Sequence, residues 1–306
     1  MVAMAIDAVL NWPERLFRVI GHPVTWLGRL IEGVDAAWNR DCDLPALRRA
    51  LGTMAALGAI GLPTMLAWAV QAQLGSGWTS IIVAGILAWP LVALRSLHDH
   101  VMAVADPLQA GDIKAARAKV AHIVGRDPLT LDEAAIARAA IESLAENASD
   151  GVVAPLFWGA IFGLPGIVAY KAINTLDSMI GHRTSRHEAF GWAAARIDDV
   201  ANYIPARLTG VLFALLSRER RIAISRMICD GPRHRSINAG WPEAAMASAL
   251  GVRLSGPRTY HGEVAAEPWL NAGARDPHAP DILQALKLYS RAMLLLATAL
   301  VILALV

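Results

Sequence analysis

The chain has 306 residues, of which 55% are hydrophobic and 18% are charged, and its formal net charge is +2. Because soluble domains contain roughly a quarter of charged residues, this composition favours a membrane protein. A net charge this small, without a lysine-rich tract, argues against a nucleic-acid partner. The two cysteines, Cys42 and Cys229, are too far apart in the sequence for a disulfide framework or a zinc motif.

The first predicted elements are apolar. Met1–Leu10 is apolar but contains Asp7 and no basic residue, so we expect a short membrane-associated helix and not a cleaved signal peptide. Residues 50–94 contain no charged residue or histidine. At about 20 residues per span, they accommodate two membrane helices, at 50–70 and 78–94, separated by a Gly- and Ser-rich break at Gln71–Gly77. Basic residues flank this hairpin but are absent from its turn, which predicts that both flanks are cytoplasmic.

Residues 95–150 are predicted to be a cytoplasmic helical segment. Apolar residues recur at helical intervals in Asp112–Ile123 and in Leu131–Leu144. The second helix is preceded by a capping-box sequence at Thr130–Glu133, which predicts its first turn.

Two further apolar segments are less regular. Residues 151–170 contain Pro155, Pro165 and several glycines, and residues 204–217 contain Arg207 near their start. If both segments crossed the bilayer, a basic loop would face outward, against the usual charge bias. We therefore expect them to be broken or re-entrant, a geometry that buried polar surroundings permit.

The C-terminal part combines a polar region and a last membrane segment. Residues 218–287 are rich in Gly and Pro and are expected to form a polar loop segment with a short helix at Pro242–Leu250. Residues 288–306 form the last membrane segment, with Arg291 reaching the headgroups. Because no strand alternation or repeat is present, the expected fold is all-α, a single multi-pass membrane domain with about four or five membrane segments.

Polar residues gather beside these apolar segments, and the first such set lies around residue 146. Its members are Glu142, Glu146, Asn147 and Asp150. Glu142 and Glu146 are four residues apart and share a helix face, and such carboxylates suit Mg²⁺ that also binds phosphate oxygens. The alternative is a solvated helix end.

The second set follows the third apolar segment. Ionisable groups at membrane depth are costly and usually have a role, although an ordinary helix exit into the headgroups is the alternative. The members of this set are Lys171, Asn174, Asp177, Ser178, His182 and Arg183.

The third set consists of Arg196, Asp198, Asp199, Asn202 and Arg207. Asp198 and Asn202 share a helix face, and Arg207 needs a partner, either Asp199 or a substrate phosphate. A structural ion pair is the alternative reading.

The fourth set begins at Asn238 and includes Glu243. Its proline and its acidic first turn predict a helix start, whose backbone amides either hold an anion or are simply capped. The sequence contains no glycine-rich nucleotide-binding motif of the familiar types.

Five segments, in this order and over nearly the whole chain, resemble the adenosylcobinamide-phosphate synthase family of cobalamin biosynthesis. They are His22–Glu32 (HPVTWLGRLIE), Val124–Phe157, Asn174–Arg183 (NTLDSMIGHR), Ala195–Thr209 (ARIDDVANYIPARLT) and Asn238–Gly262. The chain departs from the family pattern before His22, where Gly-Asp-Pro is expected, and at Ser236–Asn238, where Ser-Pro-Asn is expected.

The resemblance implies a reaction. Such an enzyme joins a propionate of adenosylcobyric acid to (R)-1-aminopropan-2-yl phosphate, or to ethanolamine phosphate, in an amide bond driven by ATP with Mg²⁺. Activation of a carboxylate as an acyl phosphate gathers negative charges, which metal ions and basic side chains neutralise. The expected location is the bacterial inner membrane, with the active site facing the cytoplasm, and other cobalamin-pathway enzymes are candidate partners.

The resemblance also suggests roles for the polar residues. Catalytic roles fall to Glu146, Asp177, Asp198 and Asp199, and metal binding to Glu142, Glu146, Asp150 and Asp177. Phosphate neutralisation and substrate orientation fall to Lys171, Arg183, Arg196, Arg207, Asn147, Asn174, Asn202, Asn238 and Glu243.

Two other functions remain open at this stage. A related membrane family linked to β-lactamase regulation has a similar layout and a sensory role, but a sensor has little need for the intact acidic sets. A transporter would show inverted internal repeats, which the sequence lacks.

Overall fold

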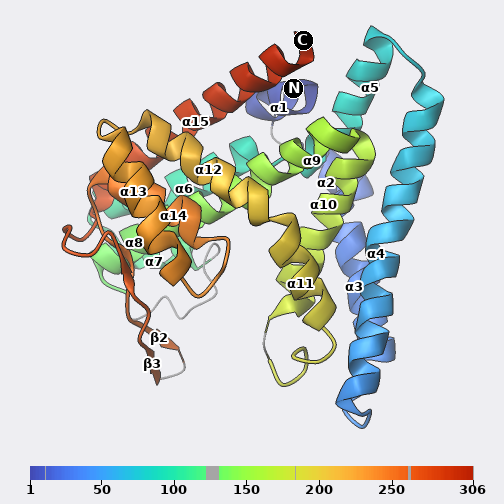
Figure 1. The fold of residues 1–306 in the computed structure, drawn as a ribbon, viewed down its shortest axis with the longest axis horizontal. Coiled ribbons are helices and arrows are strands. Elements are labelled where there is room, and N and C mark those ends of the chain that lie inside the picture. Colours follow the sequence, from blue (N-terminus) through green and yellow to red (C-terminus); the bar gives the residue numbers. More distant parts are fainter. Residues whose placement is uncertain (11, 122–130, 183, 261–262, 306) are drawn as a thin grey trace. The chain divides into compact units, whose positions relative to one another are not determined.

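The computed structural model describes residues 1–10, 12–121, 131–182, 184–260 and 263–305, and most of them are helical (Figure 1). The chain forms two compact units. Unit 1 comprises Met1–Ala93 and Ala154–Asn202, and unit 2 comprises Leu94–Val153 and Tyr203–Val306. The predicted all-α membrane fold is confirmed, because three apolar helical stretches are long enough to cross a bilayer: Pro45–Leu74, Trp78–Gln109 and Ala279–Leu305.

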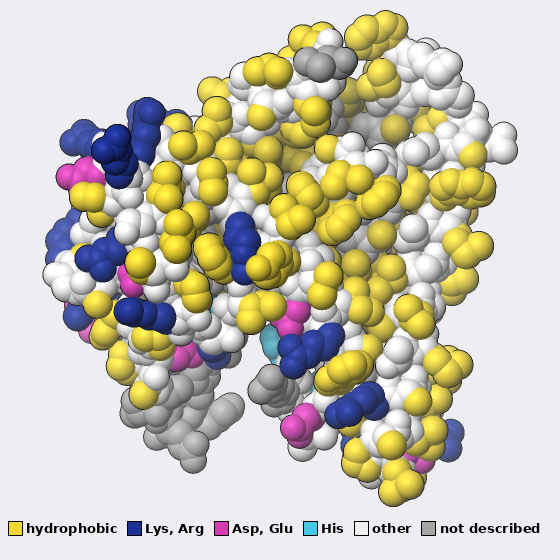
Figure 2. Space-filling model, viewed as in Figure 1, with side chains coloured by type: hydrophobic (Ala, Val, Ile, Leu, Met, Phe, Trp, Pro, Cys, Tyr) yellow, Lys and Arg dark blue, Asp and Glu magenta, His cyan; other side chains and the backbone are white. Residues whose placement is uncertain are grey.

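The membrane hairpin of unit 1 consists of α4 (Pro45–Leu74) and α5 (Trp78–Ala88). Pro45 occupies the first turn of α4, so the helix begins five residues before the predicted span. The turn between the helices is tighter than expected, and Gly75 and Gly77 adopt positive φ angles there. Hydrophobic side chains predominate over both helices (Figure 2). Trp68 and Trp78, on either side of the turn, are 66% and 82% exposed, as suits a surface that faces lipid.

The N-terminal elements of unit 1 are α1 (Val2–Val9), α2 (Glu14–Ile20) and α3 (Pro23–Trp38). The His22–Glu32 motif starts α3 with a capping box. The Nδ1 atom of His22 accepts a hydrogen bond from the amide of Val24 at 3.2 Å, and the amide of His22 donates to Oγ1 of Thr25 at 3.2 Å. Pro23 fits the first helical position because it needs no amide partner there.

The third apolar segment is broken, as expected. In unit 1 it forms α9 (Ala154–Phe162) and α10 (Leu164–Leu176), which are separated by Gly163 at φ +69°. The amide of Leu164 donates a 2.7 Å hydrogen bond to Oε1 of Gln71, so a side chain of α4 caps α10. Helix α10 packs against α3 and α4 and continues into η4 (Asp177–Gly181), and α11 (Trp192–Ala201) follows.

Unit 2 contains the helices of the segment that was predicted to be helical between residues 95 and 150. They are α6 (Leu94–Gln109), α7 (Ile113–Val120) and α8 (Glu133–Ala148), which continues into η3 (Ser149–Val153). The first turn of α8 is capped by Asp132, whose Oδ1 accepts the amide of Ala135 at 2.8 Å. The predicted cap at Thr130 and the end of the first predicted helix fall outside the described residues.

The prediction of a polar loop segment over 218–287 is wrong in part. After α12 (Tyr203–Leu216), the chain forms α13 (Arg220–Asp230), the short η5 (Gly231–Arg233) and α14 (Gly240–Leu250). Helix α13 was not predicted because its sequence, which has a basic exposed face, shows little apolar periodicity. Its apolar side buries Ala223 and Met227. Helix α14 confirms the predicted short helix, and it ends at Gly251, which has the left-handed conformation typical of that position.

The remaining chain of unit 2 contains short strands that the sequence did not predict. Strand β1 (Leu254–Ser255) pairs with β4 (Trp269–Leu270), and β2 (Arg258–Tyr260) pairs with β3 (Glu263–Ala265), both antiparallel. Strands of two or three residues are too short to show an alternating pattern. The last helix, α15 (Ala279–Leu305), packs against α6 and α8 and starts well before the predicted span.

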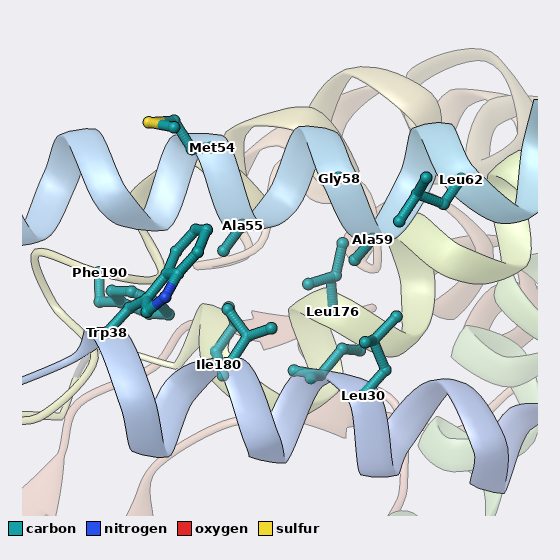
Figure 3. Close-up of a pocket in the computed structure, with 12 residues that line it drawn as sticks. Leu30, Trp38, Met54, Ala55, Gly58, Ala59, Leu62, Leu176, Ile180 and Phe190 are labelled. Atoms are coloured by element: carbon teal, nitrogen blue, oxygen red, sulfur yellow. The ribbon is translucent and has the colours of Figure 1, made fainter.

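An apolar cavity of about 150 Å³ lies inside unit 1 (Figure 3). Helix α3 contributes Leu30 and Trp38, α4 contributes residues from Met54 to Leu62, and Leu176 and Ile180 project from the end of α10 and from η4. The lining contains no charged residue, so the cavity suits an apolar group and not the phosphate chemistry implied by the resemblance.

Candidate functional site

Two of the predicted polar sets lie at π-helical turns. Turn η3 (Ser149–Val153) follows α8 in unit 2, and η4 (Asp177–Gly181) follows α10 in unit 1. A π turn inserts a residue into a helix and is frequently found at functional sites. Both turns fall within motifs of the family resemblance, so the most specific sequence signals coincide with irregular backbone.

In unit 1, α10 and η4 bring part of the second set together. Nζ of Lys171 donates to Oδ1 of Asn174 at 3.5 Å, and Oγ of Ser178 donates to the carbonyl of Asn174 at 2.8 Å. Lys171 and Asn174 are half-buried, so both are accessible to a ligand. Arg183, the last member of this set, lies outside the described residues.

Asp177 opens η4 and has an unusual electrostatic environment. Burial raises the pKa of its carboxyl group, and the negative charge of Asp199 raises it further, while His182 acts in the opposite direction. A Cβ atom at Gly181 would collide with Oδ1 of Asp177, so a side chain at this position would displace the carboxylate. A carboxylate with a raised pKa is a stronger base than an ordinary aspartate.

Helix α11 and the residue that follows it supply the third set except for Arg207, which lies in α12. Nδ2 of Asn202 donates to Oδ2 of Asp198 at 3.0 Å, which confirms that these residues share a face, and the hydroxyl of Tyr170 donates to Oδ1 of Asn202 at 2.8 Å. Asp199 instead forms an ion pair with Arg196 at 3.1 Å. Asp198 and Asp199 therefore have different partners although they are adjacent in the sequence.

Two residues of unit 1 were not among the predicted site residues. Tyr170 orients Asn202, as described above. His22 lies close enough to Lys171 for the lysine charge to matter: burial lowers the pKa of the imidazole, and the charge of Lys171 lowers it further. The only sequence signal for His22 was its place in the first family motif, because a capping histidine looks like a structural residue.

In unit 2, Glu142 of the first set is buried and supports the fold, whereas the other members of the set are accessible to solvent. Glu142 is 5% exposed, and its Oε1 accepts the amide of Ser255 at 2.6 Å. Ser255 has φ +60°, so the buried carboxylate holds a strained turn in place. Glu146 and Asn147 are exposed, and Asp150 is half-buried at the start of η3.

Arg207 of α12 is stacked between two aromatic rings. Its guanidinium carbon lies 3.5 Å from the ring centroid of Tyr203 and 4.3 Å from that of Trp241. Its Nη1 atom donates to the Tyr203 carbonyl at 2.6 Å and to Oδ1 of Asn238 at 3.3 Å. These partners are neutral, so the stacked guanidinium keeps its positive charge in a fixed orientation, which suits a phosphate oxygen.

The fourth set forms the start of α14. Asn238 is buried and contacts Arg207, as described above, and Oγ of Ser236 accepts the amide of Ala239 at 3.1 Å. Glu243 is 3% exposed, and its Oε2 lies 3.7 Å from Nε2 of the buried His234. Glu243 thus has a buried partner, His234, whereas Asn238 contacts Arg207.

The predicted metal ligands are divided between the two units. Within the described residues, no group of three or more His, Cys, Asp or Glu side chains could hold a metal ion. Glu142, Glu146 and Asp150 belong to unit 2, and Asp177 belongs to unit 1. Glu146 and Asp150 are accessible carboxylates four residues apart, and Mg²⁺ commonly takes only one or two protein carboxylates together with phosphate oxygens.

Comparisons with known proteins agree with this layout. The family model described as CobD/Cbib protein matches residues 1–289. A cobalamin biosynthesis protein CobD of Rhodobacter capsulatus is 60% identical over 293 residues, which cover 96% of this chain and 92% of that protein. Proteins of the same name from Brucella suis biovar 1 and Rhizobium meliloti are 47% and 46% identical, covering 96% and 90% of this chain and 93% and 86% of their own lengths. No solved structure matches. The chain therefore belongs to the CobD/Cbib family.

Proposed function

We propose that this protein is an adenosylcobinamide-phosphate synthase, a membrane enzyme that forms an amide bond in cobalamin biosynthesis at the expense of ATP. The observation that carries the proposal is the environment of Asp177. Burial and the nearby Asp199 raise its pKa, and the reaction that the family resemblance implies needs such a base.

The reaction has two steps. A propionate oxygen of adenosylcobyric acid attacks the γ-phosphorus of ATP, the bond to the β-phosphate oxygen breaks, and an acyl phosphate and ADP result. The amine of the aminopropanol phosphate then attacks the acyl carbon, the carbon–oxygen bond to phosphate breaks, and the amide and inorganic phosphate form. The attacking nitrogen loses protons in this step, so a basic group must receive one.

Asp177 is the proposed proton acceptor for the amine. Its raised pKa makes its carboxylate a better base than an ordinary aspartate, and Asp199 maintains that pKa through its charge. Asn202, held between Tyr170 and Asp198, orients one substrate. Lys171, Asn174 and Arg196 contribute positive charge and hydrogen bonds to the same substrate set.

Arg207 is the proposed phosphate ligand of unit 2. Its planar guanidinium is held by two rings and by Asn238, so little side-chain freedom is lost when an anion binds. Glu146 and Asp150 would hold Mg²⁺ together with phosphate oxygens, and bound Mg²⁺ would neutralise the charge that develops on them. Asn147 orients the same phosphates, and Glu142 and Glu243 support the fold around them.

The site is proposed to face the cytoplasm, in the bacterial inner membrane. Two facts support this placement: ATP is a cytoplasmic substrate, and basic residues flank the apolar hairpin while its turn has none. The corrinoid is large and amphipathic, which gives a reason for an enzyme of this reaction to be embedded in a bilayer.

The decisive experiment is an in-vitro reaction. Purified protein in detergent is incubated with adenosylcobyric acid, ATP, Mg²⁺ and aminopropanol phosphate, and mass spectrometry detects the amide. We expect amide only when ATP is present, a loss of at least about a hundredfold in Asp177→Asn, and nearly unchanged turnover in Asp106→Asn, an exposed aspartate of α6.

Two other outcomes would contradict either the enzyme assignment or the role of Asp177. Wild-type protein that binds the corrinoid but never forms an amide would contradict the enzyme assignment and favour the sensory alternative. Full turnover in Asp177→Asn would remove the proposed base while leaving the reaction intact.

A further inference from the structure

Three cationic side chains of unit 2 line one pocket away from the residues discussed so far. Arg218 lies in the turn between α12 and α13, and Lys287 and Arg291 come from α15. The pocket has a volume of about 560 Å³, within the range of roughly 300–1,000 Å³ that is usual for small-molecule sites. The C-terminal end of α14 forms another wall, so three separate helices build the pocket.

The charges in this pocket are not balanced within the described part of the chain. The side chains of Arg218, Lys287 and Arg291 are exposed and have no ion-pair or hydrogen-bond partner among the described residues. Glu219 is the one carboxylate in the described lining. The C-terminal ends of α12 and α14 each contribute about half a negative charge, which still leaves the pocket positive. Basic side chains also gather around the neighbouring α13 (Figure 2).

The helix face that presents these cations changes character along α15. Gln284, Lys287 and Arg291 follow one another at intervals of three and four residues, so they share a face. The same face continues through Leu294 and Ile302, which are 69% and 60% exposed. Thr298, between them, donates its hydroxyl to the carbonyl of Leu294 at 2.9 Å and so presents no free donor.

A basic pocket that is followed by an exposed apolar stripe suits an amphiphilic ligand. A positive pocket is followed, along one stripe of a helix that is long enough to span a bilayer, by about 17 Å of exposed apolar surface from Leu294 to Leu305, at 1.5 Å per residue. One leaflet of the hydrocarbon core is about 15 Å thick, so the stripe accommodates an acyl chain. A free phosphate would need the cations only and would leave the apolar stripe unexplained.

We infer that this pocket binds the phosphate headgroup of an anionic phospholipid, with the acyl chains lying along the exposed face of α15. Basic pockets beside membrane helices are suited to such headgroups. Cations that merely anchor a helix at the interface need no partner from another segment, whereas Arg218, in the turn between α12 and α13, lines the same pocket as Lys287 and Arg291. The site is independent of the proposed catalytic reaction.

The test compares lipid binding by the full-length protein and two triple variants. One variant carries Arg218→Gln, Lys287→Gln and Arg291→Gln. The matched control carries Arg15→Gln, Arg29→Gln and Arg40→Gln, which removes the same charge from exposed arginines of unit 1. Native mass spectrometry in detergent measures retained phosphatidylglycerol against phosphatidylcholine, and thermal unfolding with each lipid reports whether binding stabilises the protein.

The expected result is a preference for phosphatidylglycerol of about tenfold or more in the wild type and in the control, and its loss in the pocket variant. Equal preference in all three proteins would overturn the inference. A third arm adds inorganic phosphate without lipid: a stabilisation that equals the lipid effect and disappears in the pocket variant would show a free-phosphate site and overturn the lipid assignment. If the pocket variant does not fold, Arg218→Gln alone must still weaken the preference about fivefold.

Discussion

The buried hydroxyl of Tyr170 donates a 2.8 Å hydrogen bond to Oδ1 of Asn202, and each of these side chains is only 1% exposed. This bond fixes the Asn202 amide so that its Nδ2 faces Asp198. A contact between α10 and the end of α11 thereby determines the orientation of a candidate substrate-binding residue.

Removing that hydroxyl should affect both stability and function. Tyr170→Phe leaves the Asn202 carbonyl oxygen buried without its donor, which costs about 1–3 kcal/mol and lowers the unfolding midpoint by several degrees. Because Asn202 can then rotate, we expect kcat to fall more than KM changes. Thermal unfolding and steady-state kinetics measure the two effects, and Tyr289→Phe, which removes a comparable bond to the Leu94 carbonyl in unit 2, is the control for stability alone. Equal kinetic losses in both variants would argue against an orienting role.

The space at Gly181 should be needed for catalysis more than for folding. Gly181→Ala places a Cβ atom against Oδ1 of Asp177, so the carboxylate must move. We expect turnover to fall by about tenfold or more, since small displacements of a reacting group are costly. Gly33→Ala in α3 is the matched control, because no atom lies within 4 Å of its added Cβ. Unchanged turnover in Gly181→Ala would mean that the position of Asp177 is not critical.

The pH dependence of the reaction should report the coupling between Asp177 and Asp199. Burial and the charge of Asp199 raise the pKa of Asp177, so the base is protonated, and activity is lost, at a higher pH than for an ordinary aspartate. Asp199→Asn removes one cause, so the acidic limb of kcat/KM against pH should move to lower pH. A shift in the opposite direction, or none, would exclude Asp177 as the group that titrates.

The stacking of Arg207 should matter more than its charge. Arg207→Lys retains the charge but loses the planar group between Tyr203 and Trp241, so we expect KM for a phosphate-bearing substrate to rise by about tenfold. Arg226→Lys, at an exposed position of α13, should change nothing. If Arg207→Lys behaves like the control, charge alone is sufficient there and the stacking has no role in binding.

An ion-pair network in unit 2 should make the unfolding midpoint of the protein depend on pH. A hydrogen bond from Arg253, together with Arg138, lowers the pKa of Asp276 to about 2, against burial. Because the folded pKa is depressed, the stabilisation is complete above the unfolded pKa of about 4 and is lost as the pH falls towards 2. The unfolding midpoint of the wild type should exceed that of Asp276→Asn by a constant amount above about pH 5, and the difference should shrink below pH 4. A difference that is independent of pH would contradict this assignment.

The sequence predicted the membrane helices well because their signal is local. An uncharged stretch from residue 50 to residue 94 has few structural alternatives, and α4 and α5 appear where it lies. The start of α14 was predicted for the same reason, since proline and glutamate in a first turn are local signals. Helix α13 was missed, because a short helix with a basic exposed face shows little apolar periodicity.

The residue types of the candidate site were predicted from the sequence, but the contacts between these residues were not. The residue types, the family and the segments that carry them can all be read from the amino-acid order, since carboxylates and amides stand beside uncharged apolar segments. Which of these residues contact one another depends on the packing of the helices. Glu142 accepts a hydrogen bond from the Ser255 amide, Arg207 stacks against two aromatic rings, and Asn202 accepts a hydrogen bond from Tyr170. Except for Tyr203, which lies one helical turn before Arg207, these partners are 30 or more positions apart in the sequence, and no local preference encodes the pairs. The burial of each polar group required a partner, and packing selected which one.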